Sequence, residues 1–148
     1  KLDIFEDEVT RRQQVADRYM AMLDNLVETP RLAAAATSSW AQYTVKLPEG
    51  ADRDHVATVM WAHDVPTAVY YPVPMHQQPP YRNFPVADGG LDVTSDLCAR
   101  VLALPMHPYL EASIQEQIAA ALATALGAGV MAENAVAEGS AVEGSAAG

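Results

Sequence analysis

The first 27 residues show the clearest pattern in the chain, because apolar side chains recur there at the three- and four-residue spacing of a helix. They are Phe5, Val9, Ala16, Tyr19, Met20, Leu23, Leu26 and Val27. This spacing puts them on one face and predicts an amphipathic helix over residues 2–27. Asp7 and Arg11 lie four apart with the acid first, which is the favoured order for an ion pair on a helix. The helix is expected to end before Pro30.

Three shorter segments have the composition of β-strands. Residues 40–47 alternate in polarity and contain aromatic and β-branched types, residues 65–71 follow a His-Asp turn, and residues 101–104 form a short apolar run. Apolar or alternating runs of this length, bounded by turn residues, predict a strand in each segment.

Further helices are predicted over residues 53–62, 94–100 and 110–126. Asp52 is expected to cap the first of these. The last helix has an inner face formed by Leu110, Ile114, Ile118, Ala121, Leu122 and Ala125. Together with the strands, this order of elements predicts an α+β fold: a short sheet with helices on one face.

Two segments lack such periodicity. Residues 72–92 are rich in proline and glycine, which indicates a long loop. Residues 127–148 consist almost entirely of alanine, glycine, serine and glutamate. That composition offers little apolar surface to bury, so we expect one ordered domain over residues 1–126 and a disordered tail over residues 127–148.

Charge and cysteine content narrow the possible partners. The net charge of −10 argues against nucleic acid and against an anionic membrane surface, since both attract lysine and arginine. No apolar run approaches the ~20 residues that a membrane span needs. Cys98 is the one cysteine, so no internal disulfide can form, and a cytoplasmic, reducing setting is expected.

The most informative stretch for chemistry is the proline-rich loop from Tyr70 to Arg82. It gathers Tyr70, Tyr71, His76 and Tyr81, whose flat rings and hydrogen-bonding groups suit a sugar or a nucleotide. Its prolines are expected to hold it extended and to reduce the entropy lost when it orders around a ligand. The alternative is a rigid connector whose tyrosines pack on the sheet.

Other reactive side chains give weaker signals. The four histidines have no metal-binding spacing, so no metal site is expected. Cys98, on the inner face of a short helix, is interpreted as a buried structural thiol. Trp40 and Trp61 are interpreted as core or interface anchors. A glycine-rich phosphate loop and a GxSxG nucleophile motif are both absent from the sequence.

Two motifs make the chain resemble a known family. The segments AVYYPVPMHQQPPYRNFP and LDVTSDLCARVLALPMHPYL resemble the C-terminal part of sugar aminotransferases of the DegT/StrS type. The matching residues are Tyr71, Pro72, Pro74, His76, Gln78, Pro79, Leu104, Pro105, Met106, His107, Pro108 and Leu110. The start of the chain is similar to the family's long helix that leads out of the large domain. The segment TSSWAQYTV looks closest to members that aminate UDP-2-acetamido-2-deoxy-3-oxo-glucuronate.

The resemblance implies the small C-terminal domain of a fold type I enzyme, a homodimer, and pyridoxal phosphate as cofactor. It implies ping-pong transfer of an amino group from glutamate to a keto nucleotide-sugar for polysaccharide or related sugar biosynthesis. Such chemistry needs a Schiff-base lysine, which the family keeps in its large N-terminal domain. Lys1 and Lys46 lack that context, so no catalytic residue is expected here and the isolated chain is expected to be inactive.

By the same resemblance, Tyr70, Tyr71, His76 and Tyr81 are expected to bind the sugar substrate. Tyr70 departs from the family, which usually has histidine at that position; a phenol keeps the aromatic ring but is not a base near neutral pH. The alternative function is a non-catalytic regulatory or interaction module derived from the same domain. An upstream domain with the Schiff-base lysine would distinguish the two.

Overall fold

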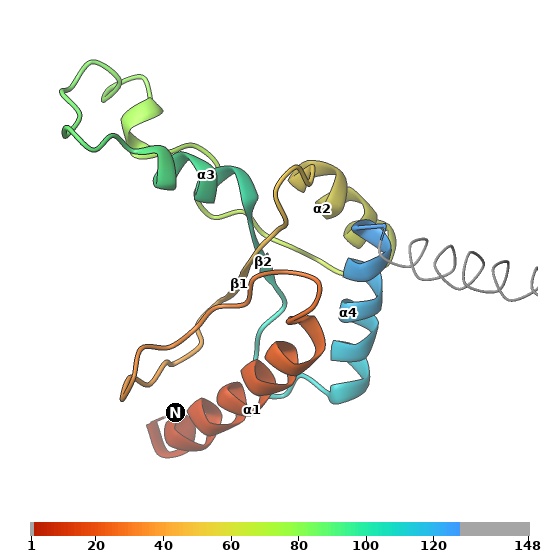
Figure 1. Ribbon diagram of the computed structural model, residues 1–148. Coiled ribbons are helices and arrows are strands. Elements are labelled where there is room, and N and C mark those ends of the chain that lie inside the picture. Colours follow the sequence, from red (N-terminus) through yellow and green to blue (C-terminus); the bar gives the residue numbers. More distant parts are fainter. Residues whose placement is uncertain (1, 128–148) are drawn as a thin grey trace, which may run out of the picture.

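The computed structural model describes residues 2–127, which form a body and a projecting arm (Figure 1). The body comprises residues 2–69 and 100–127. The arm, residues 70–99, is drawn in green and extends away from the helices α1 (Phe5–Leu23) and α4 (Ala112–Ala125). The tail predicted to be disordered lies outside the described residues, except for Gly127.

Helix α1, Phe5–Leu23, follows a short 3₁₀ turn, Leu2–Ile4, and confirms the predicted N-terminal helix. It ends four residues earlier than predicted. The amides of Leu26 and Val27 both return to the carbonyl oxygen of Leu23, at 2.8 and 3.0 Å, and form a turn. This turn brings Glu28 beside Lys46 as an isolated antiparallel bridge, so a tertiary contact replaces the last helical turn.

The sheet consists of β1, Tyr43–Lys46, and β2, Val101–Leu104, paired antiparallel with Tyr43 opposite Leu104. Because side chains alternate along a strand, this register gives the sheet two distinct faces. Tyr43 and Val45, with their β2 partners, point into the core and are fully or almost fully buried. Thr44 lies on the other face, which is open.

The predicted strand over residues 65–71 is wrong apart from one residue pair. Ala68 and Ala103 exchange two backbone hydrogen bonds, of 3.1 and 2.8 Å, and the pairing extends no further. Pro66 lacks an N–H to donate, and Pro72 restricts the residue before it, so a ladder cannot grow in either direction. The predicted strand over 40–47 is likewise shortened, because Trp40 has a positive φ of 47°.

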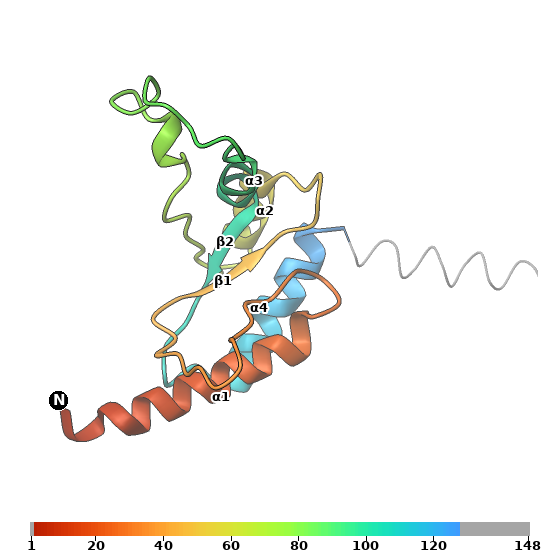
Figure 2. The same cartoon turned by 60° about the vertical axis from the view of Figure 1, so that its left-hand side comes forward.

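Helices α1, α2 and α4 cover one face of the sheet, which confirms the predicted α+β class (Figure 2). Helix α2, Arg53–Ala62, has the predicted bounds, and the Asp52 side chain caps it by accepting hydrogen bonds from the Asp54 and His55 amides. Helix α4 spans Ala112–Ala125. The largest fully buried side chains are Tyr19, Tyr43, Leu23, Leu47, Met60, Leu102, Leu122, Gln115, Val15, Val45 and Val56.

A buried polar network joins α1 to α4. The Gln115 amide donates to the Val15 carbonyl oxygen at 2.9 Å and accepts from the Arg18 guanidinium, which also donates to the Leu110 carbonyl oxygen. Gln115 thus occupies the inner face of α4, whereas Ile114, predicted to face inward, is 40% exposed. The apolar pattern could not show this exchange, because Gln115 is buried through hydrogen bonds rather than through hydrophobicity.

Candidate functional site

The arm consists of a loop over residues 70–91 and helix α3, Asp92–Arg100, whose last residue belongs to the body. The loop is folded into turns, which corrects the expected extended shape. A 3₁₀ turn spans Met75–Gln77, and the Tyr81 amide then donates to the Gln78 carbonyl oxygen at 2.9 Å. Pro79 is the second residue of that latter turn, a position where its fixed φ favours a bend. The prolines of the loop over residues 70–91 therefore favour a compact shape built from turns.

The open face of the sheet, one side of α3 and the start of the arm enclose a groove of about 260 Å³, called here the sheet groove. Its lining residues are Gln42, Thr44, Ala68, Val69, Tyr70, Tyr71, Thr94, Leu97, Cys98, Val101 and Ala103. Tyr70 and Tyr71 are 53% and 78% exposed, so both rings are available to a ligand. The groove offers an apolar floor with hydroxyl and amide groups at its edges.

The two motifs that carry the family resemblance meet beside this groove. Tyr70, from the first motif, lines a smaller hollow of about 190 Å³ with Pro105 and Met106, from the second. The bridge between Ala68 and Ala103 holds the two segments together. Segments more than thirty residues apart in sequence thus form one wall.

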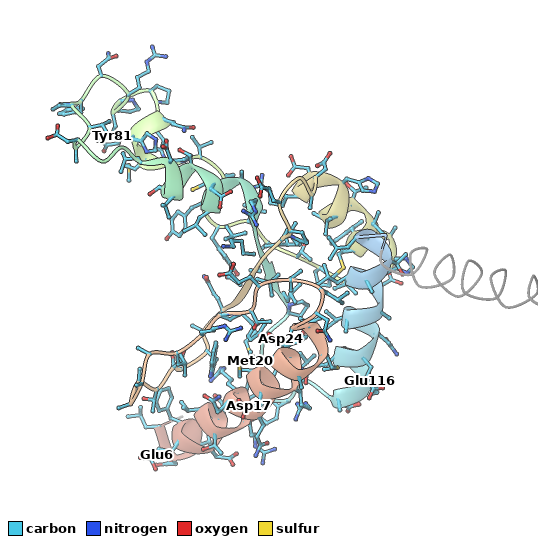
Figure 3. All side chains as sticks on the ribbon, in the orientation of Figure 1. Glu6, Asp17, Met20, Asp24, Tyr81 and Glu116 are labelled. Atoms are coloured by element: carbon cyan, nitrogen blue, oxygen red, sulfur yellow. The ribbon has the colours of Figure 1, made fainter. Side chains whose placement is uncertain are left out.

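His76 and Tyr81 lie in a separate pocket of about 310 Å³ near the outer end of the arm, called here the tip pocket (Figure 3). Its lining residues are Met75, His76, Tyr81, Phe84, Pro85, Val86, Leu91 and Thr94. The rings of Tyr81 and Phe84 pack with centroids 6.2 Å apart. The four predicted site residues therefore form two pairs, and Thr94 lines both cavities.

A side-chain contact fixes the loop of the arm to its helix. The Gln77 amide donates to the Ser95 hydroxyl at 3.1 Å, and that hydroxyl donates to the Leu91 carbonyl oxygen at 3.2 Å. The contact joins the 3₁₀ turn that bears His76 to the helix that bears Thr94. It therefore ties the turn of the tip pocket to the helix whose Thr94 also lines the sheet groove.

One interpretation from sequence needs correction, and three residues were missed. Cys98 is only half-buried and lines the sheet groove, because α3 lies outside the core. Of the two tryptophans interpreted as core or interface anchors, Trp40 is buried in the core and Trp61 is 72% exposed at the surface. Gln42, Thr44 and Thr94 were not recognised as groove residues. Strand alternation could have placed Thr44 on the open face; only the tertiary structure brings α3 over it.

The described residues do not supply a Schiff-base lysine. The Lys46 ammonium is paired with the Glu28 carboxylate, and Lys46 lines neither the sheet groove nor the tip pocket. Within residues 2–127, no group of three or more His, Cys, Asp or Glu side chains could hold a metal ion. None of the helices in this part of the chain is long and apolar enough to cross a membrane.

The sequence profile of the DegT/DnrJ/EryC1/StrS aminotransferase family matches residues 1–123. The chain belongs to this family. It is 40% identical, over 125 residues, to a UDP-2-acetamido-2-deoxy-3-oxo-D-glucuronate aminotransferase of Pseudomonas aeruginosa, with 82% of this chain and 33% of that protein covered. The recognised resemblance to sugar aminotransferases is thereby confirmed.

Solved structures share the fold. A DegT/DnrJ/EryC1/StrS aminotransferase from Brucella abortus is 39% identical with a TM-score of 0.75, covering 82% of this chain and 32% of that one. DesV from S. venezuelae, solved with a ketimine intermediate, is 26% identical with a TM-score of 0.74, covering 84% of this chain and 33% of that one. This chain therefore spans about a third of the length of these relatives.

Proposed function

We propose that this chain is one domain of a sugar aminotransferase that moves an amino group from glutamate to a keto nucleotide-sugar. The observation that carries the proposal is the 40% identity to an aminotransferase named for a UDP-3-oxo-glucuronate derivative. The residue range 1–126 would be the small C-terminal domain. A homodimer, a cytoplasmic location and a role in polysaccharide or related sugar biosynthesis complete the proposal.

The arm supports this function through its exposed side chains. Tyr71, Met75, Phe84 and Val93 are all more than 60% exposed, although each carries a large apolar surface. Met75 and Phe84 line the tip pocket and Tyr71 lines the sheet groove, and exposed apolar surface beside a cavity is typical of an interaction site. Because the chain spans a third of its relatives' length, we propose that the remainder of the enzyme covers part of the arm and closes the substrate site against it.

We propose that pyridoxal phosphate is bound mainly by that remainder. The described residues do not fit the cofactor's need for a lysine, since Lys46 is paired with Glu28 and lies in neither cavity. The contribution of this chain is then to bind and orient the sugar. Tyr70 and Tyr71 would act from the sheet groove, and His76 and Tyr81 from the tip pocket.

The test is Tyr71→Phe in the complete gene product, with the two half-reactions measured separately. The phenol of Tyr71 can hydrogen-bond a sugar hydroxyl, and its loss should cost about 1–3 kcal/mol of transition-state binding. The half-reaction with the keto sugar should slow accordingly, while the half-reaction with glutamate stays near the wild-type rate.

A matched control is Tyr109→Phe, because Tyr109 is also exposed but lies on the body, where its hydroxyl donates to Glu8 at 3.1 Å. This variant should leave both half-reactions unchanged. Equal slowing of both by Tyr71→Phe would assign Tyr71 to the cofactor rather than the sugar. No effect on either would leave the arm as a stiff connector.

A second test uses the chain of residues 1–148 alone. It should show no transaminase activity and form no imine with pyridoxal phosphate, because Lys46 is held in an ion pair. The measurement is absorbance at the imine band, followed by borohydride reduction and mass analysis. A reduced adduct on Lys46 would contradict the assignment of the cofactor to the rest of the enzyme.

A further inference from the structure

The basic side chains of the described residues are almost all occupied by partners within the same chain. Ion pairs with carboxylates hold Arg11, Arg12, Arg31, Lys46, Arg53 and Arg100. Arg18 has no carboxylate partner, but its guanidinium is held by Gln115 and by the Leu110 carbonyl oxygen. Each of these side chains therefore has a partner within the chain, although pairs such as Arg31–Asp24 are exposed to solvent.

Arg82 is the exception. Its guanidinium has no ion pair and no hydrogen bond to any residue in the 2–127 range, and the residue is exposed. Its backbone, by contrast, is fixed: the Arg82 amide donates to the Gln78 carbonyl oxygen at 3.1 Å. The arm thus presents one uncompensated positive charge from a defined turn.

The surroundings of Arg82 make that charge informative. It directly follows Tyr81, whose ring lines the tip pocket together with His76. Among the acids of the arm, Asp96 is paired with Arg100, and neither Asp88 nor Asp92 forms an ion pair with Arg82. In a chain of net charge −10, a free cation that is the next residue in sequence after an aromatic lining residue of a pocket is suited to an anionic ligand.

We propose that Arg82 binds an anionic group of the nucleotide-sugar substrate, namely its diphosphate, while the tip pocket contacts the adjoining ring. This inference rests on the proposed function. A guanidinium presents planar, paired donors that match phosphate and carboxylate oxygens. A carboxylate on the sugar offers the same chemistry, so the experiment must separate the two sources.

The experiment compares Arg82→Gln, Arg82→Lys and the control Arg31→Gln in the complete gene product. Arg31 is also exposed and lies on the body, 3.7 Å from the Asp24 carboxylate. A charged hydrogen bond to substrate predicts a roughly 10- to 100-fold rise in KM for the keto nucleotide-sugar in Arg82→Gln. Arg82→Lys should recover part of the loss, and Arg31→Gln and the KM for glutamate should match wild type.

Binding of uridine diphosphate, measured by calorimetry, identifies the anion and does not depend on catalysis. A weakened Kd in Arg82→Gln, parallel to the rise in KM, supports contact with the diphosphate. An unchanged Kd combined with a raised KM for the sugar overturns that assignment and gives Arg82 to a sugar carboxylate.

The two proposals can fail separately. If the wild-type gene product has no aminotransferase activity but binds uridine diphosphate through Arg82, the proposed function is wrong and the anion site stands. If the enzyme is active and Arg82→Gln behaves like Arg31→Gln in both KM and Kd, the proposal for Arg82 is overturned.

Discussion

The body and the arm of this chain differ in where their apolar side chains lie. In the body, apolar side chains from three helices and two strands meet in one core, and the few buried polar groups bond mainly to one another or to backbone. In the arm, α3 has no buried residue, and large apolar side chains are exposed. The body buries its apolar side chains within itself. The arm leaves apolar surface exposed, which is available to a ligand or to another part of the enzyme.

The largest expected difference in stability between the body and the arm can be tested with two leucines that are close in sequence. Leu102 in β2 is fully buried, and Leu97 in α3 is 40% exposed. Leu102→Ala should destabilise the chain by about 2–5 kcal/mol, because it leaves a cavity in the core. Leu97→Ala should cost less than about 1 kcal/mol. Urea unfolding of both variants provides the measurement; equal losses would show that the arm stabilises the body.

Two glutamines test the same contrast for polar contacts. Gln115→Ala removes the buried link between α1 and α4 and leaves the Arg18 guanidinium with the Leu110 carbonyl oxygen as its one hydrogen-bond partner among the described residues. The expected loss of stability is about 1–3 kcal/mol. Gln77→Ala removes an exposed hydrogen bond in the arm and should change stability by no more than about 0.5 kcal/mol. Thermal melting of the two variants provides the measurement. A clear drop in the melting temperature of Gln77→Ala would show that the arm contributes to the stability of the body.

Two buried tyrosines sharpen the account of the core. The Tyr19 hydroxyl donates to the Pro105 carbonyl oxygen at 2.9 Å, whereas the Tyr43 hydroxyl is buried without a partner among the described residues. Tyr19→Phe should therefore cost about 0.5–1.5 kcal/mol, while Tyr43→Phe should be neutral or slightly stabilising. Chemical denaturation at pH 7 measures both, and a clear loss in Tyr43→Phe would reveal a partner for that hydroxyl.

Burial also raises the pKa of Tyr19 and Tyr43 above the ordinary value of tyrosine. The folded state therefore keeps these protons longer than the unfolded state does. Stability should be unaffected by these groups below about pH 10 and should fall as the pH rises beyond it. Tyr43→Phe should make that alkaline fall in stability shallower. Thermal melting at pH values roughly one unit apart, from about pH 8 to about pH 11, would detect the difference.

The smallest effect is expected at the cap of α2. Backbone hydrogen bonds, chiefly from His55, lower the pKa of Asp52. Its contribution to stability is present above the ordinary carboxyl pKa and is lost as the pH falls through the lower folded value. Asp52→Asn should keep the cap but remove this part of the acid dependence. Asp88→Asn in the arm is the control, because the Asp88 side chain makes no hydrogen bond to any of the described residues. The stability of this variant should match that of wild type across the acid range.

Local sequence signals were sufficient for the helices and for two of the strands. The 3.6-residue period predicted α1, and Asp52 before an apolar run predicted the bounds of α2. These features depend on side chains close in sequence and on capping chemistry, so they can be read without knowing the fold. The two motif segments, which start at Ala68 and Leu91, could also be recognised from sequence, and the family match confirms the resemblance that they indicated.

Only the tertiary structure decided the rest, because the deciding contacts join distant residues. The strand predicted over 65–71 shrank to the pair Ala68–Ala103, since prolines at both ends stop the ladder. Gln115 entered the core because Val15 and Arg18, a hundred positions away, complete its hydrogen bonds. The predicted site divided into two cavities because the loop folds back onto α3. A periodic pattern records which side chains share a face, but not which distant partner that face will meet.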